Sequence, residues 1–135
     1  MKKIILAVFL LLSSCSYHAT EVIDGDTIKT EIGTIRFSGI NTPEKGECYY
    51  EEAKEKTKEL VLHKQIKLEG DYVEEDEFGR KLRYIYVEQT FVNGLLVEEG
   101  YARVFDVYNK TTKRYNELKV LEEKAKSENK GIWNC

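Results

Sequence analysis

The sequence has few of the residues that build several common active sites, and it contains no long hydrophobic run. Its 135 residues include two His, three Cys and one Pro. The longest apolar run, Ile4–Leu12, is too short to cross a bilayer, because a membrane-spanning helix needs about 20 apolar residues. The composition therefore excludes a membrane-embedded helical bundle, and the few prolines and glycines exclude a collagen-like fibre.

The sequence also lacks an excess of positive charge. It has 24 acidic and 21 basic residues, for a formal net charge of -3. Proteins that hold nucleic acid on a broad basic surface use many Lys and Arg contacts to phosphates, so the composition argues against that mode of binding. The length and the apolar fraction of 41% are typical of one globular domain.

Residues 1–14 have the pattern of an export signal. Two lysines precede the apolar run, and the segment ends in Leu12-Ser13-Ser14-Cys15. This ending is similar to the lipobox of bacterial lipoproteins, in which Cys15 would receive acyl chains and become the new N-terminus. We therefore expect an exported protein with a lipidated tether over residues 15–20, anchored at the cell membrane or envelope. Cleavage by an ordinary signal peptidase, which would leave a secreted protein, is the alternative.

Export would place the other two cysteines in an oxidising compartment. Cys48 and Cys135 allow one intramolecular pairing, and we predict that they form a disulfide. The alternative is two unpaired thiols. A bridge between them would close a loop that contains most of the domain.

Residues 21–135 are predicted to form one α+β domain. Runs rich in β-branched residues between glycine-containing turns predict strands over residues 22–23, 27–32, 35–40, 65–71 and 81–88. Apolar residues at helical spacing predict helices over residues 47–63, 93–99 and 112–128. In the last helix we expect four residues to face inward, namely Tyr115, Leu118, Leu121 and Ala125. This order fits a small curled sheet or barrel that is covered by helices.

Three short polar clusters lie at the edges of the predicted strands. They are Asp24-Gly25-Asp26-Thr27, Arg36 with Asn41-Thr42-Pro43-Glu44, and Phe78-Gly79-Arg80. Each cluster is weak evidence by itself, since Asp-Gly is a common turn and most arginines are solvated surface residues. In this order, and followed by Gly131-Ile132-Trp133, they resemble the staphylococcal nuclease (thermonuclease) family from about Glu21 to Trp133.

The resemblance implies a five-stranded OB-type β-barrel with about three helices. It also implies a Ca²⁺-dependent phosphodiesterase, an endonuclease that cleaves DNA and/or RNA and leaves 3′-phosphate ends. The implied catalytic residues are Arg36, Glu44 and Arg80, and the implied ligands of one Ca²⁺ or other divalent ion are Asp26, Asn41 and Thr42. We expect the protein to be a monomer.

The residue types suit this chemistry. A phosphodiester gains negative charge in its transition state, and the guanidinium forks of Arg36 and Arg80 match phosphate oxygens. Carboxylate, amide and backbone carbonyl oxygens are ligands that Ca²⁺ accepts together with water. Glu44 would then be free to hold and deprotonate the attacking water.

Several positions depart from the family pattern. Asn41 replaces an Asp, which removes one negative charge from the predicted metal shell and should weaken Ca²⁺ binding. Glu77 and Phe78 replace a Lys-Tyr pair that contacts a terminal phosphate, and Asp106 replaces one of two tyrosines near the base. Phe78 and Tyr108 remain as predicted substrate-binding residues.

The sequence offers no competing set of catalytic residues. His18 lies in the expected tether and His63 at a helix end, and there is no Cys-x-x-Cys pair for zinc. The alternative to an enzyme is a non-catalytic OB-type module of the cell envelope that binds nucleic acid or a protein. The presence of Arg36, Glu44 and Arg80 favours the enzyme.

Overall fold

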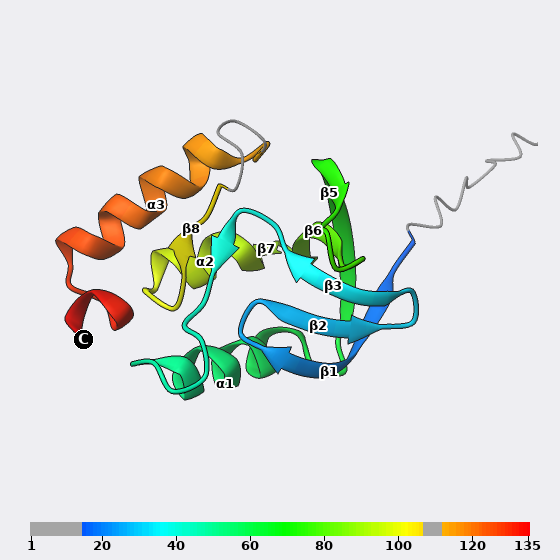
Figure 1. The fold of residues 1–135 in the computed structure, drawn as a ribbon, viewed down its shortest axis with the longest axis horizontal. Coiled ribbons are helices and arrows are strands. Elements are labelled where there is room, and N and C mark those ends of the chain that lie inside the picture. Colours follow the sequence, from blue (N-terminus) through cyan, green and yellow to red (C-terminus); the bar gives the residue numbers. More distant parts are fainter. Residues whose placement is uncertain (1–14, 107–111) are drawn as a thin grey trace, which may run out of the picture.

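The computed structural model describes residues 15–106 and 112–135. Five strands form a closed circuit, in which β1 (Tyr17–Asp24), β2 (Thr27–Thr30) and β3 (Gly33–Phe37) follow one another as an antiparallel meander. β5 (Gln65–Glu75) pairs antiparallel with both β1 and β6 (Lys81–Val87). The parallel pairing of β3 with β6 closes the barrel (Figure 1). The five-stranded OB-type barrel is therefore confirmed.

Three short strands complete the sheet structure of the described residues. β7 (Thr90–Phe91) extends the sheet beside β6. β4 (Ile40–Asn41) leaves the barrel after β3 and pairs with β8 (Arg103–Val104), so that Ile40 lies opposite Val104 and Asn41 opposite Arg103. This pairing joins the strand that carries Asn41 to the C-terminal part of the chain.

The described part of the chain contains three α-helices and a short 3₁₀ helix, Gly131–Asn134. Helix α1 (Tyr50–Val61) packs against β1, and α2 (Val92–Glu98) packs against α3 (Tyr115–Ser127). Figure 1 shows α3 and the C-terminus at the end of the molecule away from the β2–β3 hairpin. Within residues 15–106 and 112–135, no helix has the length and apolarity needed to span a membrane.

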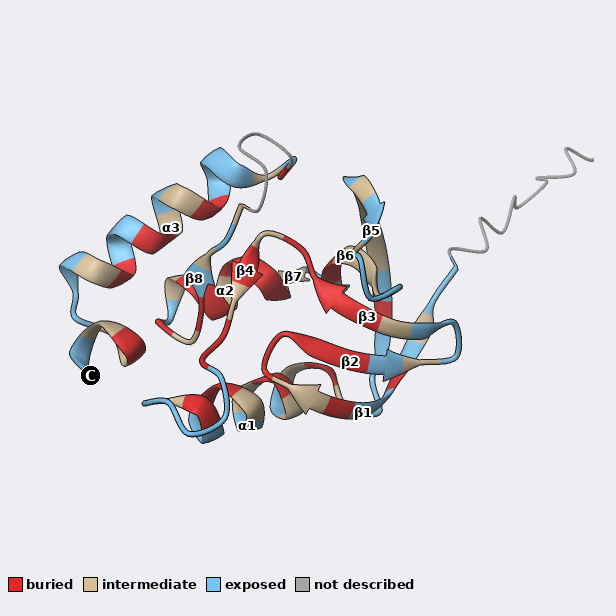
Figure 2. Cartoon of the chain, in the orientation of Figure 1, coloured by how far each residue is buried: buried red, intermediate tan, exposed pale blue. Residues whose placement is uncertain are grey.

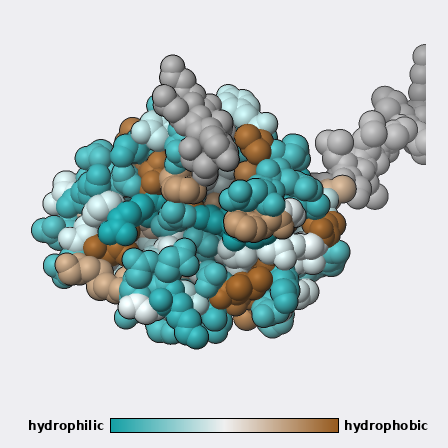
Figure 3. Space-filling model, in the orientation of Figure 1, coloured by the Kyte–Doolittle hydropathy of each residue, from teal (hydrophilic) through white to brown (hydrophobic). Residues whose placement is uncertain are grey.

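The hydrophobic core fills the barrel and continues beneath α2. Ile28, Ile35 and Ile66 of the barrel have no solvent exposure, and neither have Val92 and Leu96 of α2. Figure 2 shows buried residues over the first part of β2, the end of β3 and most of α2, whereas buried and exposed residues alternate along α1 and α3. On the face drawn in Figure 3, hydrophilic residues predominate and hydrophobic residues form small separate groups.

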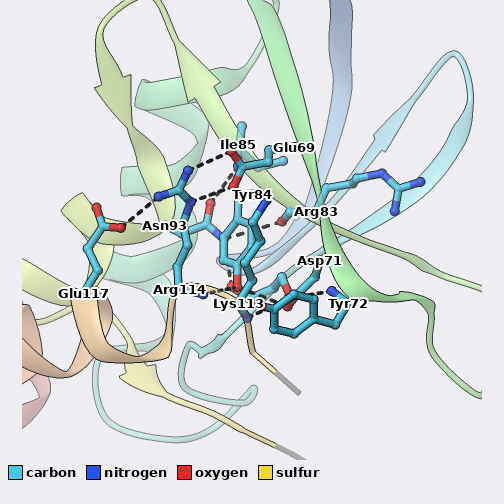
Figure 4. Close-up of polar contacts among 11 residues, drawn as sticks. Glu69, Asp71, Tyr72, Arg83, Tyr84, Ile85, Asn93, Lys113, Arg114 and Glu117 are labelled. Atoms are coloured by element: carbon cyan, nitrogen blue, oxygen red, sulfur yellow. Dashed lines mark hydrogen bonds and ion pairs between the residues drawn. The ribbon is translucent and has the colours of Figure 1, made fainter. Parts of the chain in front are cut away.

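Hydrogen bonds of Arg114 attach the start of α3 to the barrel. The guanidinium of Arg114 donates two hydrogen bonds to the carboxylate of Glu69 on β5, at 2.6 and 2.7 Å, and one to Glu117 at 2.9 Å (Figure 4). These hydrogen bonds raise the pKa of Arg114 above its ordinary value, although burial opposes them. A bidentate pair of this kind orients as well as attracts, so it positions α3 on β5.

Strand β1 begins earlier than the sequence analysis placed the domain. The sequence predicts a tether over residues 15–20, but residues 17–20 lie in β1, with Ala19 fully buried opposite Thr30. The alternation of buried and exposed residues along β1 is interrupted at two register shifts, around Thr20 and Ile23. Because these irregularities blur the two-residue period, the pattern did not reveal the whole strand.

The inward face of helix α3 matches the prediction in part, and Leu121 packs against the core as expected. Leu118 and Ala125 are buried as expected, but Tyr115 is exposed and Glu122 is buried, with 4% of its surface accessible. The carboxylate of Glu122 accepts the backbone N–H of Val104 at 2.6 Å and pairs with Lys119 at 2.6 Å. These contacts replace the hydrogen bonds to water that the carboxylate loses when it is buried.

The predicted disulfide is present. Cys48 and Cys135 are bonded across 87 residues, with their Cα atoms 6.1 Å apart. The bridge joins the segment before α1 to the last residue of the chain. Cys15 is exposed and unpaired.

Candidate functional site

The predicted catalytic residues meet in one cleft of about 580 Å³. Arg36, Glu44 and Arg80 line it. Three further predicted residues also line it, namely Asp26, Asn41 and Phe78. Thr42 is not among the lining residues, but its backbone N–H donates a hydrogen bond to Asp26, which lines the cleft. Tyr108 lies outside the described residues.

The turn between β1 and β2 places Asp26 at the base of the cleft, where it is only 6% exposed. Its Oδ1 accepts the hydroxyl of Thr27 and its Oδ2 accepts the N–H of Thr42, both at 2.9 Å. Gly25 is needed beside it, because a Cβ at that position would lie 2.9 Å from the side chain of Thr42. These contacts fix the carboxylate in one orientation.

Arg36 lies near the end of β3 and is almost fully buried. Its Nη1 donates to the carbonyl oxygens of Phe37 and Ile40, at 2.7 and 2.8 Å, and its Nη2 donates to Oδ1 of Asn41. Nη2 also lies 3.4 Å from Oδ2 of Asp26. Burial lowers the pKa of Arg36, and the negative charge of Asp26 acts in the opposite direction. The guanidinium is therefore a fixed cation.

Arg80 follows the turn between β5 and β6, and Asp76 holds it in place. Nε of Arg80 donates to Oδ2 of Asp76 at 2.6 Å, and Oδ1 of Asp76 accepts the backbone N–H groups of Phe78 and Arg80 at 2.9 Å. Burial raises the pKa of Asp76, but the hydrogen bonds from Arg80 outweigh it, so that the pKa is lowered overall. This leaves both Nη groups of Arg80 without a hydrogen-bond partner in the described residues.

Asp76 is a site residue that the sequence analysis missed. It lies four residues before Arg80, and the Asp76-Glu77-Phe78-Gly79 segment has the composition of a turn in which Asp accepts following N–H groups. Gly79 has a φ of 76°, which favours glycine. The turn pattern could have identified Asp76 as the residue that orients Arg80.

Glu44 lies in the exposed segment between β4 and α1. Its N–H donates to Oε1 of Glu47 at 2.7 Å, and its carbonyl oxygen accepts the N–H of Glu47 at 2.9 Å. Among residues 15–106 and 112–135, no group donates a hydrogen bond to its side-chain carboxylate. Glu44 is therefore held through its backbone, and no donor among the described residues fixes its carboxylate.

The oxygen atoms near Asp26 suit a hard cation. The carboxylate of Asp26, the side-chain oxygen of Asn41 and the carbonyl of Thr42 are oxygen donors, and the hydroxyl of Thr42 is buried with no hydrogen-bond partner in the described part of the chain. The described residues contain no group of three His, Cys, Asp or Glu side chains that could hold a metal ion. A cation here would therefore keep several water ligands, as Ca²⁺ and Mg²⁺ commonly do.

A second carboxylate lines the cleft beside this donor set. Oδ1 of Asp24 accepts the hydroxyl of Tyr50 at 2.8 Å. This hydrogen bond raises the pKa of Tyr50 to about 12. The contact with α1 positions Asp24 at the rim of the cleft, where its negative charge adds to that of Asp26.

The closed barrel and its polar cleft define an OB-type domain with two fixed arginines and carboxylates at one site. Residues 34–135 match the family model described as staphylococcal nuclease homologue, and the chain belongs to this family.

Similar curated proteins carry nuclease names. The chain is 40% identical over 123 residues to the SPbeta prophage-derived endonuclease YokF of Bacillus subtilis (strain 168), covering 83% of this chain and 42% of that protein. It is 38% identical to endonuclease YncB of the same strain, covering 83% of this chain and 58% of the relative. It is 30% identical to the thermonuclease of Staphylococcus hyicus, covering 88% of this chain and 76% of the relative. The chain thus spans about half the length of the two Bacillus relatives.

Proposed function

We propose that the protein is a Ca²⁺-dependent endonuclease that hydrolyses phosphodiester bonds of DNA and/or RNA and leaves 3′-phosphate ends. The observation that carries this proposal is the meeting of two guanidinium groups, a free carboxylate and several oxygen donors in one cleft. The names of the similar proteins support it.

The two arginines would stabilise the charge that develops on the phosphate. Both Nη groups of Arg80 are available to phosphate oxygens, while Nε is held by Asp76. Arg36 adds a fixed positive charge, because its guanidinium is anchored to two carbonyl oxygens. Groups that are already oriented stabilise a transition state without the cost of reorganisation.

Glu44 would act as the general base. Its carboxylate takes a proton from water, the water oxygen bonds to phosphorus, and the bond from phosphorus to the 5′-oxygen breaks. The 5′-oxygen leaves and takes a proton from solvent water, and the phosphate stays on the 3′-oxygen. A positioned base contributes about 10²- to 10⁴-fold to a rate of this kind. A Ca²⁺ ion held by Asp26, Asn41 and Thr42 would supply positive charge beside the phosphate.

The test is a cleavage assay on plasmid and single-stranded DNA, with Ca²⁺ and then with EDTA. We expect cleavage only with Ca²⁺, and the products should prime a polymerase only after treatment with a 3′-phosphatase. Glu44→Gln should lower kcat at least about 100-fold, whereas Glu52→Gln, at an exposed position of α1, should not. Absence of Ca²⁺-dependent cleavage at micromolar protein would contradict the proposal and favour the binding module.

We also propose that the protein is exported and attached to the cell membrane through lipid on Cys15. The exposed, unpaired thiol of Cys15 lies two residues before β1 and supports this proposal. Metabolic labelling with palmitate should mark the wild-type protein and not a Cys15→Ala variant. If the wild-type protein takes up no label, the lipid is excluded and simple secretion becomes the better hypothesis.

A further inference from the structure

The cleft has an unusual charge for a site that receives a polyanion. Among the described residues that line it, seven carry carboxylates and two carry guanidinium groups. Arg36 and Arg80 can hold one phosphate, and a cation at Asp26 can add to that attraction. The remaining carboxylates repel the phosphates on either side of it. Within this lining, groups without charge are the ones that can bind the rest of the substrate without such repulsion.

Two exposed aromatic rings line the same cleft. Phe78 is 75% exposed and Phe105 is 41% exposed. They come from different parts of the chain, since Phe78 lies in the turn between β5 and β6 and Phe105 follows β8. The guanidinium of Arg80 lies 5.4 Å from the centre of the Phe78 ring, which is therefore already in contact with a cation.

Phe105 is held firmly by its backbone although its ring is exposed. Its N–H donates to the carbonyl oxygen of Gly39 at 2.8 Å, in the turn between β3 and β4. The preceding residue, Val104, donates its N–H to Glu122 of α3 and pairs with Ile40 of β4. The segment is thus fixed on two sides. Because the backbone is already fixed, little conformational entropy is lost when the ring binds a flat partner.

The position of the ring has no structural explanation within the described residues. Phe105 is not among the residues that pack against the hydrophobic core, whereas Val104 beside it is. An exposed Phe leaves apolar surface in water, which is unfavourable for a residue without a partner. Bases stack on such rings in proteins that bind single strands, and stacking does not depend on charge.

We infer that Phe105 is a substrate-binding residue that stacks on an unpaired base next to the cleaved phosphodiester. This inference rests on the proposed function, because it places nucleic acid in the cleft. Phe105 supplies neutral binding energy where the carboxylates prevent further phosphate contacts. It acts on binding of the substrate and not on the reacting atoms, so its effect falls on KM more than on kcat.

The test compares two single-stranded dodecamers with the same phosphates, one of thymidines and one in which every base is missing. Their dissociation constants are measured by fluorescence anisotropy with Ca²⁺ and purified protein in the Glu44→Gln background, which suppresses cleavage. Phe105→Ala should weaken binding of the thymidine dodecamer about five- to tenfold, the lower part of the range for stacking on one base. It should leave binding of the abasic dodecamer unchanged.

Two control variants isolate the role of the ring. Phe105→Trp should bind both dodecamers as the parent does, because it keeps an aromatic face. Tyr72→Ala removes another exposed aromatic ring, 69% accessible, that does not line the cleft, and should change neither constant. With Glu44 restored, Phe105→Ala should raise KM five- to tenfold and change kcat less than twofold.

The outcomes separate this inference from the proposed function. Equal binding of the thymidine dodecamer by Phe105→Ala and its parent overturns the inference, and so does an equal loss on both dodecamers. Parent protein that binds neither dodecamer also overturns it. Binding that depends on Phe105, in a wild-type protein that never cleaves, refutes the nuclease and leaves the stacking role standing.

Discussion

At the scale of single residues, the site depends on side chains whose orientation is fixed by neighbours. Asp26 accepts hydrogen bonds at both oxygens, Arg36 is anchored to two carbonyls, and Arg80 is held by Asp76. Glu44 differs, because only its backbone is held. The side chain of Glu44, the proposed general base, is not held by neighbours, whereas the charged groups of Asp26, Arg36 and Arg80 are fixed. This arrangement suits proton transfer beside a phosphate whose charge is stabilised.

Asn41 should limit the affinity for the metal ion. Its Oδ1 accepts a hydrogen bond from Arg36 and can offer a cation only a partial charge. Asn41→Asp adds a full negative charge to the donor set, so the Ca²⁺ concentration for half-maximal cleavage should fall about tenfold or more. The measurement is a Ca²⁺ titration of initial cleavage rate.

Asn116→Asp is the matched control for this titration. Asn116 is exposed on α3, so its change adds the same charge to the molecule outside the cleft. It should leave the titration midpoint unchanged. An unchanged midpoint for Asn41→Asp as well would remove Asn41 from the metal site.

The site residues that form short motifs could be predicted from the sequence, but not every residue that supports them could. Arg36, Asn41 and Glu44 stand close together in the chain, so their order is informative by itself. Glu122 holds the backbone of Val104, next to Phe105 of the cleft lining, from far along the chain, and in the sequence it resembles an ordinary surface residue of an amphipathic helix. The burial of Glu122 is explained by the position of Val104 next to α3, because the carboxylate of Glu122 accepts the N–H of Val104.

At the scale of elements, Glu122 joins α3 to β8. Burial raises its pKa, but hydrogen bonds from Lys119 and Val104 outweigh this, so the pKa lies below the ordinary value of 4.5. The folded state therefore binds this proton less tightly than the unfolded state. The resulting stability is present above about pH 4.5 and is lost as pH falls through the folded pKa.

Glu122→Gln should lower the free energy of unfolding by about 1–3 kcal/mol at pH 7, because it removes charge-assisted hydrogen bonds from a buried site. Urea unfolding should show this difference shrinking as the pH falls below about 4.5. Glu123→Gln, at the neighbouring exposed position, should change stability by less than about 0.5 kcal/mol. A difference for Glu122→Gln that does not depend on pH would show that its charge is unimportant.

The disulfide joins two elements that are otherwise distant in the chain. It ties Cys48, just before α1 and four residues after Glu44, to the end of the 3₁₀ helix. That helix is itself fixed, since Ile132 is buried and its N–H donates to the carbonyl oxygen of Gly100 at 2.8 Å. The bridge therefore attaches the exposed Glu44 segment to a rigid part of the molecule.

Reduction of the disulfide should lower the free energy of unfolding by about 3–5 kcal/mol, because the bridge closes a loop of 87 residues in the unfolded chain. Urea unfolding with and without dithiothreitol measures this loss. The double variant Cys48→Ser/Cys135→Ser should match the reduced wild type and should not respond to the reductant. A loss smaller than about 1 kcal/mol would show that the bridge does not stabilise the protein by restricting the unfolded chain.

Elements with a clear period could be predicted from the sequence, and irregular ones could not. The three helices appear within a few residues of their expected positions, because their apolar residues follow a helical stripe. β1 is longer than predicted because its register shifts break the alternation on which the prediction depends, and β5 continues to Glu75, beyond the predicted end at residue 71. Its last residues are polar and are stabilised as strand by the pairing of Glu75 with Lys81.

At the scale of the whole molecule, the acidic composition and a nucleic-acid substrate are compatible if few phosphates are contacted. The formal net charge is -3, and the cleft itself carries more carboxylates than guanidinium groups. Binding would then depend on Arg36, Arg80, a bound cation and stacking, and not on a broad basic surface. Such a protein releases few counterions when it binds nucleic acid.

This argument predicts a shallow dependence of binding on salt. For one phosphate neutralised on a single strand, the slope of log K against log salt should be about −0.7, so a tenfold rise in salt should weaken binding about fivefold. The measurement is the dissociation constant of the thymidine dodecamer for Glu44→Gln protein, from about 30 to 300 mM NaCl at constant Ca²⁺. Arg80→Gln should make the slope shallower still, because it removes one of the two guanidinium groups that hold this phosphate. Arg103→Gln is the matched control and should leave the slope unchanged. Arg103 is an exposed arginine outside the cleft lining, and its guanidinium lies 5.1 Å from the centre of the Trp133 ring. A slope of about −4 or steeper would require roughly six phosphate contacts and would place most of the binding outside the cleft.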